Sequence, residues 1–570
     1  MTGAPAGLHP EAVFAMQQDK PKGRLKTVSD AKQIRHMRQN LLWPVHLLPL
    51  PEGASLQHHW QHLAKPSDHS PWREVDDEFG APTEFQERHY NEFVTFLPPV
   101  QRFLYGQGVG KAVRRSYGES PIRVMRRNDV AKVRLTLSRG DEPIEFQVVH
   151  ADLYFFFDID IAILALEVAA NDLELRVAQQ ALFRFGRAYP AYWEEDQRGG
   201  HCPWLVEWLS PDGEVLARSD YEKREKYLSF VCQHRAPAVA AHWEYLLSPL
   251  VLHHSDRPGL VRYRQLEYYR MPYMVFFAME NANVLTRADL IRMAIGNEAG
   301  PSSELPYTES YLAEFEKRFC YDRYCDAQLG TKSIGTRFMC TGDTLVVIGE
   351  AKDRFFMNAE GGFLGRFRHQ HFLLFLVAHF QRAALHMFSD RLVAAVSRLE
   401  IADAEANRIF RHDIRHALEN FLRFEHRYWF QEISNQAQAR ELFLMTRQHL
   451  ALDSLYRGIR EELQDMGSFL DVDAMRRQNE TVVRLTVVTI FGLIGTVSTG
   501  FLGMNLLAWA EQPPNFRILV FAFILAVTSA LTLYTVVKSR RLSEFLDALS
   551  DEQAGWRAKL KALRSVWSHN

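Results

Sequence analysis

The residues of this chain that could handle an ion lie near its C-terminus, in the uncharged stretch from Leu485 to Trp509. Steps of three or four residues back from Asn505 follow one face of a helix. That face combines hydroxyls, carboxamides and aliphatic groups: Asn479, Val482, Leu485, Thr489, Leu493 and Thr496. Because Mg²⁺ holds its water shell tightly and the stretch has no carboxylate to replace that shell, the face is suited to a hydrated cation moving past neutral dipoles.

The same residues permit a second interpretation. Leu485 and Leu493 are predicted to be hydrophobic constrictions, which close a pore by excluding water. The threonines can instead bond to the backbone of their own helix. Gly492, Gly495 and Gly500 can allow close helix packing without any pore. Both interpretations stay open at this point.

The elements that must position this face are membrane-spanning helices. A helix needs about 20 apolar residues to cross a hydrocarbon core roughly 30 Å thick. The stretch from Leu485 to Trp509 is about 25 residues long, and a second uncharged run from Ile518 to Val537 has about 20. The sequence therefore predicts a transmembrane hairpin over residues 481–537, with spans at about 482–507 and about 517–537.

Charges flanking the two spans predict the orientation of this hairpin. The loop 506–515 between the spans carries Glu511 and no basic residue, whereas basic residues lie beyond both outer ends. Basic flanks stay on the cytoplasmic side of a membrane. We therefore expect both termini to lie in the cytoplasm, with Glu511 in the outer loop. The flanking basic residues are Arg476, Arg477, Arg484, Lys538, Arg540 and Arg541.

The first span ends in Gly503, Met504 and Asn505, after a long charged helix and before one further span. This combination resembles the signature of the CorA family of divalent-cation channels, over about residues 438–541. The resemblance implies a homopentamer in the inner (plasma) membrane that moves divalent metal cations, chiefly Mg²⁺, through a central pore. It also implies a ring of five Asn505 carboxamides facing the incoming ion.

The chain departs from the family pattern at two places. Leu502 stands where family members usually carry an aromatic residue, and the outer loop lacks their Met-Pro-Glu-Leu sequence. The departures leave open a Zn²⁺, Co²⁺ or Ni²⁺ transporter of the same fold. A membrane-anchored oligomeric scaffold with a vestigial pore is a further alternative.

Residues 366–480 lose almost all Gly and Pro and are predicted to form a stalk of long helices. We expect helices at 367–399, at about 403–430, and from 435 to the membrane, the last with Gly467 as its one helix-disfavouring residue. Apolar residues at helical spacing from Leu452 to Leu470 form a seam, which we expect five subunits to bury.

The resemblance also implies a regulatory metal bound between subunits by acidic side chains of the lower stalk. Carboxylates are suitable hard ligands for Mg²⁺. A solvated acidic helix face is the alternative for these residues. The candidates for metal sensing are Glu461, Glu462, Asp465, Asp471 and Asp473.

Residues 1–365 are predicted to form an enlarged cytoplasmic α/β domain, because strand and helix patterns alternate. Predicted strands include 130–137, 144–151, 273–280 and 344–351, and predicted helices include 287–295 and one capped by Asp172. Ser210 to Gly213 are predicted to turn a hairpin. Residues 538–570 are predicted to form a basic flank and a C-terminal helix.

Three smaller groups contain Asp, His or Cys residues whose spacing matches no specific metal-binding or catalytic motif. Asp158 and Asp160 are interpreted as marking a turn between two strands rather than as metal ligands. His412 and His416 share a helix face, which we interpret as solvated rather than as a zinc site. The five cysteines are spaced irregularly, which indicates buried or idle thiols.

Net charge and the missing catalytic motifs argue against a nucleic-acid-binding protein and against an enzyme. A formal net charge of −2 over 570 residues gives no general attraction to nucleic acid, so we expect the partners to be lipid, metal cations and further copies of the chain. No nucleophile elbow, phosphate loop or dinucleotide fingerprint is present, since the glycines of Gly106 to Lys111 follow no predicted strand. We therefore do not expect an enzyme.

Overall fold

The computed structural model describes residues 32–51, 56, 58–64, 70–75, 87–106, 121–266, 270–301, 305–325, 335–397, 404–503, 513–516, 518–523, 526–531 and 534. Contacts divide the chain into two compact units. The first, which we call the sheet unit, comprises Met1–Met387 and Arg423–Leu455. The second, the stalk unit, comprises Phe388–Leu422 and Tyr456–Asn570. The domain boundaries predicted at 365, 480 and 537 are placed by the stalk helices and the membrane spans, not by contacts within the chain. They stay predictions.

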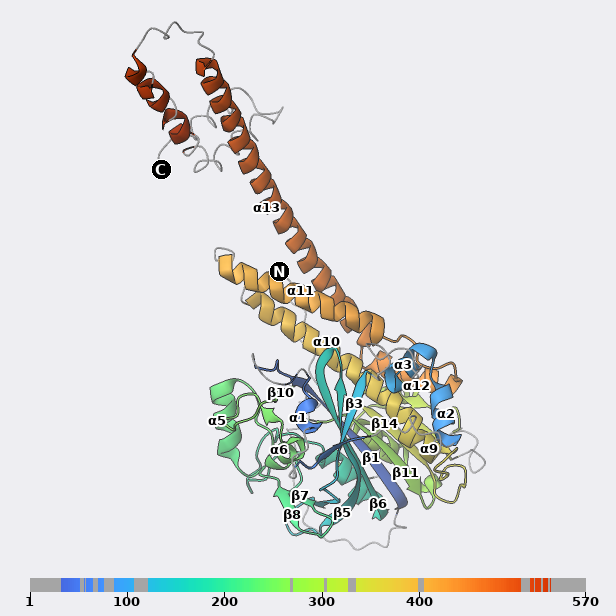
Figure 1. Ribbon diagram of the computed structural model, residues 1–570. Helices are drawn as coiled ribbons and strands as arrows, with labels where there is room; N and C mark the ends of the chain where they lie inside the picture. Colours follow the sequence, from blue (N-terminus) through green and yellow to red (C-terminus); the bar gives the residue numbers. More distant parts are fainter. Residues whose placement is uncertain are drawn as a thin grey trace. The chain divides into compact units, whose positions relative to one another are not determined.

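A fourteen-stranded sheet forms the body of the sheet unit (Figure 1). Its strands are β1 (Gln33–Leu47), β2 (Trp72–Glu74), β3 (Ile122–Arg127), β4 (Lys132–Thr136), β5 (Ile144–Phe156), β6 (Ile159–Glu174), β7 (Leu205–Leu209), β8 (Val215–Arg218), β9 (Val251–Leu252), β10 (Arg262–Gln265), β11 (Tyr273–Met279), β12 (Cys320–Tyr321), β13 (Arg337–Cys340) and β14 (Thr344–Glu350). The order is β12-β13-β14-β11-β1-β6-β5-β4-β7-β8, with β10 also beside β1 and β3 beside β5. Among the described pairs, β11/β14 and β9/β10 run parallel and the rest antiparallel.

The helices are α1 (Gln61–Ala64), α2 (Glu87–Thr95), α3 (Pro98–Tyr105), α4 (Leu175–Arg184), α5 (Arg224–His234), α6 (Ala241–Leu247), α7 (Arg287–Ile295), α8 (Glu309–Phe319), α9 (Phe363–Arg366), α10 (Phe372–Ser397), α11 (Ala404–Arg427), α12 (Ala437–His449) and α13 (Leu452–Gly503). A 3₁₀ turn covers Ala282–Val284, and a π-helical turn, η4, covers Phe367–His371.

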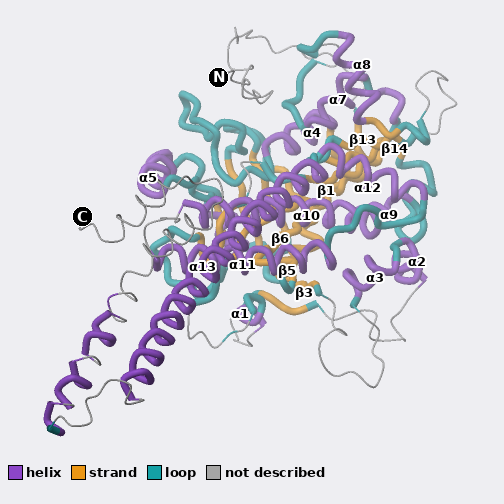
Figure 2. Tube along the Cα trace, turned by 90° about the horizontal axis from the view of Figure 1, so that it is seen from above, coloured by secondary structure: helices purple, strands orange, loops and turns teal. Residues whose placement is uncertain are grey.

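Helices cover both faces of the sheet, because alternate side chains of a strand point to opposite faces. On β5, Phe155 packs against Trp60 on one face, whereas Phe156 stacks on Phe380 of α10 on the other, with ring centroids 3.8 Å apart. The Phe155 face carries the main hydrophobic core, which includes Trp43. The Phe156 face is the one that α10 crosses (Figure 2).

The central strand β1 is an element that the sequence does not predict. It pairs with β6 from Gln33 to His46, and with β11 as far as Leu41. Pro44 is tolerated because its missing N–H would point to the side where the β11 pairing has ended and the β10 pairing begins at Val45. Burial on both faces removes the alternation that would reveal such a strand.

Several predicted elements of the sheet unit are confirmed. The β7/β8 hairpin turns through Gly213, whose φ of 85° suits glycine. Helix α7 begins with a capping box in which Thr286 and Asp289 each bond to the other's backbone. Asp158 lies in the turn between β5 and β6, as predicted.

Two predicted helix boundaries are wrong. Asp172 does not cap α4: it lies near the end of β6 with a φ of 54° and pairs with Arg35, while Glu174 precedes the helix. The predicted single helix from 435 onward is broken before α13, where Ala451 adopts a φ of 54°. No Gly or Pro marks this break, which follows from the burial of the flanking Leu450 and Leu452.

In the stalk unit, α13 packs along α11 of the same chain. Phe421 stacks on Tyr456 at 5.7 Å, and Phe410 meets Phe469 edge-on at 6.2 Å between ring centroids. The predicted seam is confirmed as buried at Leu452, Ile459, Leu463 and Leu470. The prediction that five subunits bury this seam stays a prediction.

Two described helical segments are long and apolar enough to cross a membrane. The first, Phe363–Ser397, has 72% of its apolar window buried, so it is a core helix. The second, Pro514–Leu531, has none buried and overlaps the predicted second span. Helix α13, drawn in orange in Figure 1, runs without a break through the predicted first span as far as Gly503.

Candidate functional site

The predicted ion-path residues all lie on α13, and all have exposed side chains: Asn479, Val482, Leu485, Thr489, Leu493 and Thr496. The exposed fractions of Leu485 and Leu493 are 67% and 65%, high values for leucines in a helix. Gly503 is the last residue of the helix. Met504, Asn505 and Glu511 lie outside the described residues.

The threonines of this segment bond to their own helix. The Thr489 hydroxyl donates to the Leu485 carbonyl at 2.7 Å, and that of Thr496 donates to the Gly492 carbonyl at 2.8 Å. A hydroxyl that donates to the backbone keeps oxygen lone pairs that can accept. Because the waters around a cation point their hydrogens outward, this arrangement suits a hydrated cation, although it does not require one.

The acidic candidates for metal sensing are separated along α13. Glu461, Glu462, Asp465 and Asp471 are exposed, and Asp473 is paired with Arg411 at 3.7 Å. Within the described part of the chain, no three His, Cys, Asp or Glu residues are grouped so that they could hold a metal.

The aspartate, histidine and cysteine groups singled out in the sequence have contacts that account for them without a metal. Asp158 accepts hydrogen bonds from Arg427 and from the Tyr428 hydroxyl within the sheet unit. The His412 and His416 rings stack at 6.4 Å with His412 exposed, which agrees with a solvated helix face. All five cysteines are free thiols, and burial raises the pKa of Cys202 to about 12.

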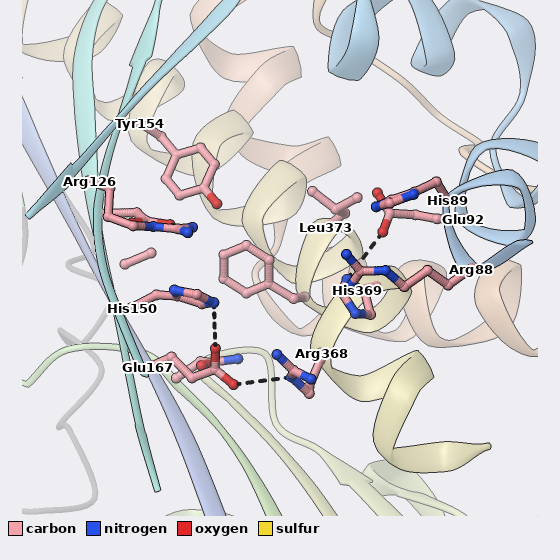
Figure 3. Close-up of a pocket in the computed structure, with 14 residues that line it drawn as sticks. Arg88, His89, Glu92, Arg126, His150, Tyr154, Glu167, Arg368, His369 and Leu373 are labelled. Carbon is pink, nitrogen blue, oxygen red and sulfur yellow. Dashed lines mark hydrogen bonds and ion pairs between the residues drawn. The ribbon is translucent and has the colours of Figure 1, made fainter. Parts of the chain in front are cut away.

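A polar cavity of about 410 Å³ lies within the sheet unit, on the Phe156 face of the sheet (Figure 3). Its strand side is formed by β1, β3, β5 and β6, and its helix side by α2, η4 and the start of α10. The strand residues are Asn40, Arg126, His150, Asp152, Tyr154, Ala165 and Glu167. The helix residues are Arg88, His89, Glu92, Arg368, His369, Phe372 and Leu373.

Ion pairs organise the strand side. Arg126 grips Asp152 with two parallel hydrogen bonds of 2.8 and 2.7 Å, a strong geometry. Glu167 is shared: Arg38 donates to it, and Figure 3 shows Arg368 and His150 approaching it at 3.7 and 3.9 Å. One carboxylate therefore serves two guanidinium groups and a histidine.

On the helix side, Glu92 is the central acceptor. The Tyr105 hydroxyl donates to it at 2.7 Å, and His369 Nδ1 lies 3.3 Å away. Burial, followed by the negative charge of Glu92, raises the pKa of Tyr105 well above its usual range. The tyrosine therefore stays protonated and donates.

Burial and neighbouring arginines lower the pKa of two basic groups in this cavity. Burial, followed by the charges of Arg38 and Arg88, lowers the pKa of Arg368, although Glu167 opposes the shift. Burial, followed by Arg126, lowers the pKa of His150.

The cavity was not found from the sequence. Its strand residues alternate along β5 and β6, as in His150, Asp152 and Tyr154, a pattern that resembles the solvent face of a strand. A feature of the structure that does mark the cavity is η4, the π-helical turn that carries Arg368 and His369. Such turns are frequent at functional sites.

Comparison of the chain with protein-family models, with curated proteins and with solved structures found no match in any of the three.

Proposed function

We propose that the chain is a CorA-like membrane channel that moves hydrated divalent cations, chiefly Mg²⁺, into the cytoplasm. The observation that carries this proposal is α13. A single helix of 52 residues, about 78 Å long at 1.5 Å per residue, joins a charged stalk to an apolar segment with exposed side chains and ends at Gly503. The sequence Gly503-Met504-Asn505 at that end resembles the ion-selectivity motif of the family.

The proposal gives each residue class a role in the transport of a hydrated ion. Five Asn505 carboxamides accept hydrogen bonds from the water shell of the incoming cation. Below them, the outward oxygens of Thr489 and Thr496 accept from the same shell, and Leu485 and Leu493 narrow the path. Entry is driven by the membrane potential, since ~2.3 kcal/mol per charge at 100 mV gives roughly 4.6 kcal/mol for a divalent ion.

The assembly in this proposal is a homopentamer in the inner membrane with both termini in the cytoplasm. The exposed apolar side chains of α13, such as Leu485 and Leu493, need lipid or other copies to cover them. Exposed apolar residues continue below the proposed span at Phe469, which also meets Phe410 of α11, and at Val472 and Met475. These residues are the proposed contacts between copies in the stalk.

The test is uptake of metal by proteoliposomes that contain the full chain. We expect Mg²⁺ uptake, blocked by a hexaammine cobalt complex that imitates the hydrated ion. Uptake of Zn²⁺, Co²⁺ or Ni²⁺ in place of Mg²⁺ would keep the fold and change the cargo. No uptake of any of the four ions would contradict the proposal and favour a membrane-anchored scaffold.

A further inference from the structure

The polar cavity of the sheet unit has features that a purely structural ion-pair cluster does not need. Four arginines lie in it or contact its wall, Arg38, Arg88, Arg126 and Arg368, against the three carboxylates Glu92, Asp152 and Glu167. Arginine is charged at every physiological pH. Among these named residues, the arginines therefore outnumber the carboxylates by one.

The excess is located near η4. Asp152 accepts two hydrogen bonds from Arg126, and Glu167 accepts one from Arg38. Arg368 reaches Glu167 only at 3.7 Å, beyond hydrogen-bond distance, and its Nε has no hydrogen-bond partner among the described residues. A half-buried guanidinium without a hydrogen-bonded acceptor is unfavourable unless an anion reaches it.

Two neighbouring polar atoms are also unpaired within the described part of the chain. His369 Nε2 has no partner, although the other ring nitrogen faces Glu92. The side-chain oxygen of Asn40 has none either, and Asn40 is only 3% exposed. Because buried polar groups are almost always hydrogen-bonded, these atoms indicate a missing partner with both an acceptor and a donor.

The size of the cavity limits what that partner is. A volume of about 410 Å³ falls within the range of small-molecule sites, roughly 300–1,000 Å³, and exceeds what an inorganic anion needs. Tyr154 and Phe372, whose rings lie 6.0 Å apart, give the cavity an apolar wall.

We propose that this cavity binds a small hydroxylated organic oxyanion. Its phosphate or carboxylate group is held by Arg368 and by His369, and a hydroxyl donates to Asn40. Sugar phosphates and hydroxy acids have this chemistry. The assignment does not depend on the channel proposal, because it concerns binding within the sheet unit alone.

The test is isothermal titration calorimetry of the full chain in detergent with ribose 5-phosphate, malate and inorganic phosphate as probes. We expect ribose 5-phosphate or malate to bind more tightly than inorganic phosphate. Preference for the first assigns a phosphate ligand, and preference for malate assigns a carboxylate. A wild-type chain that binds none of the three overturns the proposal.

Variants separate a ligand site from a structural cluster. Arg368→Gln is expected to raise the Kd about tenfold or more, since a hydrogen bond to a charged group is lost. The matched control is Arg382→Gln, which removes a similarly buried α10 arginine paired with Asp343 at 2.7 Å, outside the cavity. Equal affinity in wild type and Arg368→Gln would contradict the assignment.

A second variant tests the sign of the charge effect. Glu167→Gln removes a negative charge from the cavity and keeps a side chain that Arg38 can contact. We expect tighter binding of the same probe. Weaker binding in this variant would indicate that Glu167 itself contacts the ligand, which an oxyanion site excludes. The experiment remains decisive if Arg368→Gln does not fold.

Discussion

Two leucines show how differently the two units bury their apolar side chains. Leu164, in β6 of the sheet unit, is 1% exposed, whereas Leu493, in α13 of the stalk unit, is 65% exposed. The sheet unit covers its apolar side chains with its own helices. Leu493 of α13 stays exposed instead. The difference fits the proposal that lipid or further copies cover the upper part of α13.

The contrast continues within α13. In its lower part, up to Arg484, α13 contacts α11 through Tyr456, Phe469 and Asp473, while Val472 and Met475 stay exposed. From Leu485 onward, the exposed residues carry no charge, as expected for a helix in lipid. The helix therefore changes its surroundings along its length although its backbone continues unbroken.

The largest expected effect concerns the end of α13. Asn505→Ala removes the proposed carboxamide ring and should reduce Mg²⁺ uptake by proteoliposomes at least tenfold while leaving expression and assembly intact. The matched control is Asn515→Ala, the same change at the far end of the proposed outer loop. Equal uptake in the two variants would remove the proposed role of Asn505.

Assembly gives the next largest effect. Val472→Asp places a charge on the exposed apolar surface of the stalk and should break the proposed pentamer, because a buried unpaired charge is costly. Native mass spectrometry is expected to show five copies in the wild type and fewer in the variant. Asp at the already exposed Val393 serves as the control. A wild type that is only monomeric or dimeric would contradict the pentamer.

The same Leu→Ala substitution in each unit compares how much each leucine contributes to the free energy of unfolding. Leu164→Ala should lower the free energy of unfolding of the sheet unit by about 2–5 kcal/mol, since it leaves a cavity in a packed core. Leu493→Ala should leave that unit's unfolding unchanged and alter only transport. Denaturant unfolding followed by tryptophan fluorescence checks both. A loss from Leu493→Ala that equals the loss from Leu164→Ala would mean that α13 is part of the same core.

The smallest effect is a dependence of stability on pH that belongs to the sheet unit. Burial lowers the pKa of His371 to about 3 and that of His379 to about 4, from an ordinary 6.5. Between pH 6.5 and 4 the unfolded chain therefore binds protons that the folded chain does not. Stability is highest above pH 6.5 and falls with acid, by up to about 1.4 kcal/mol per pH unit for each histidine.

His379→Gln should make that dependence shallower, because one of the buried histidines no longer titrates. The measurement is the free energy of unfolding at several pH values between 4 and 7. His412→Gln changes an exposed histidine of the stalk unit and is the control. A wild-type stability that rises on acidification in this window would refute the assignment.

Local signals in the sequence predicted much of the sheet and of α13. Turn residues such as Gly213, the cap at Thr286 and the apolar spacing of the stalk act over a few residues, so a single sequence reveals them. Strand β1 and the cavity depend on partners far along the chain: Asn40 and Glu167 lie opposite each other only after β1 and β6 pair. The break at Ala451 likewise follows from packing rather than from a residue type.

The central claim is that one face of α13 borders an aqueous ion path, and cysteine substitution tests it most directly. The five native cysteines lie between Cys202 and Cys340, so none belongs to the proposed span. Thr489→Cys places a thiol on the proposed path, and Phe491→Cys places one two residues further on, about 200° around the helix and so on the opposite face. In proteoliposomes, a charged thiol reagent should stop Mg²⁺ uptake by Thr489→Cys and leave that by Phe491→Cys intact. Block of Phe491→Cys alone, or of neither variant while wild type transports, would contradict a path along this face.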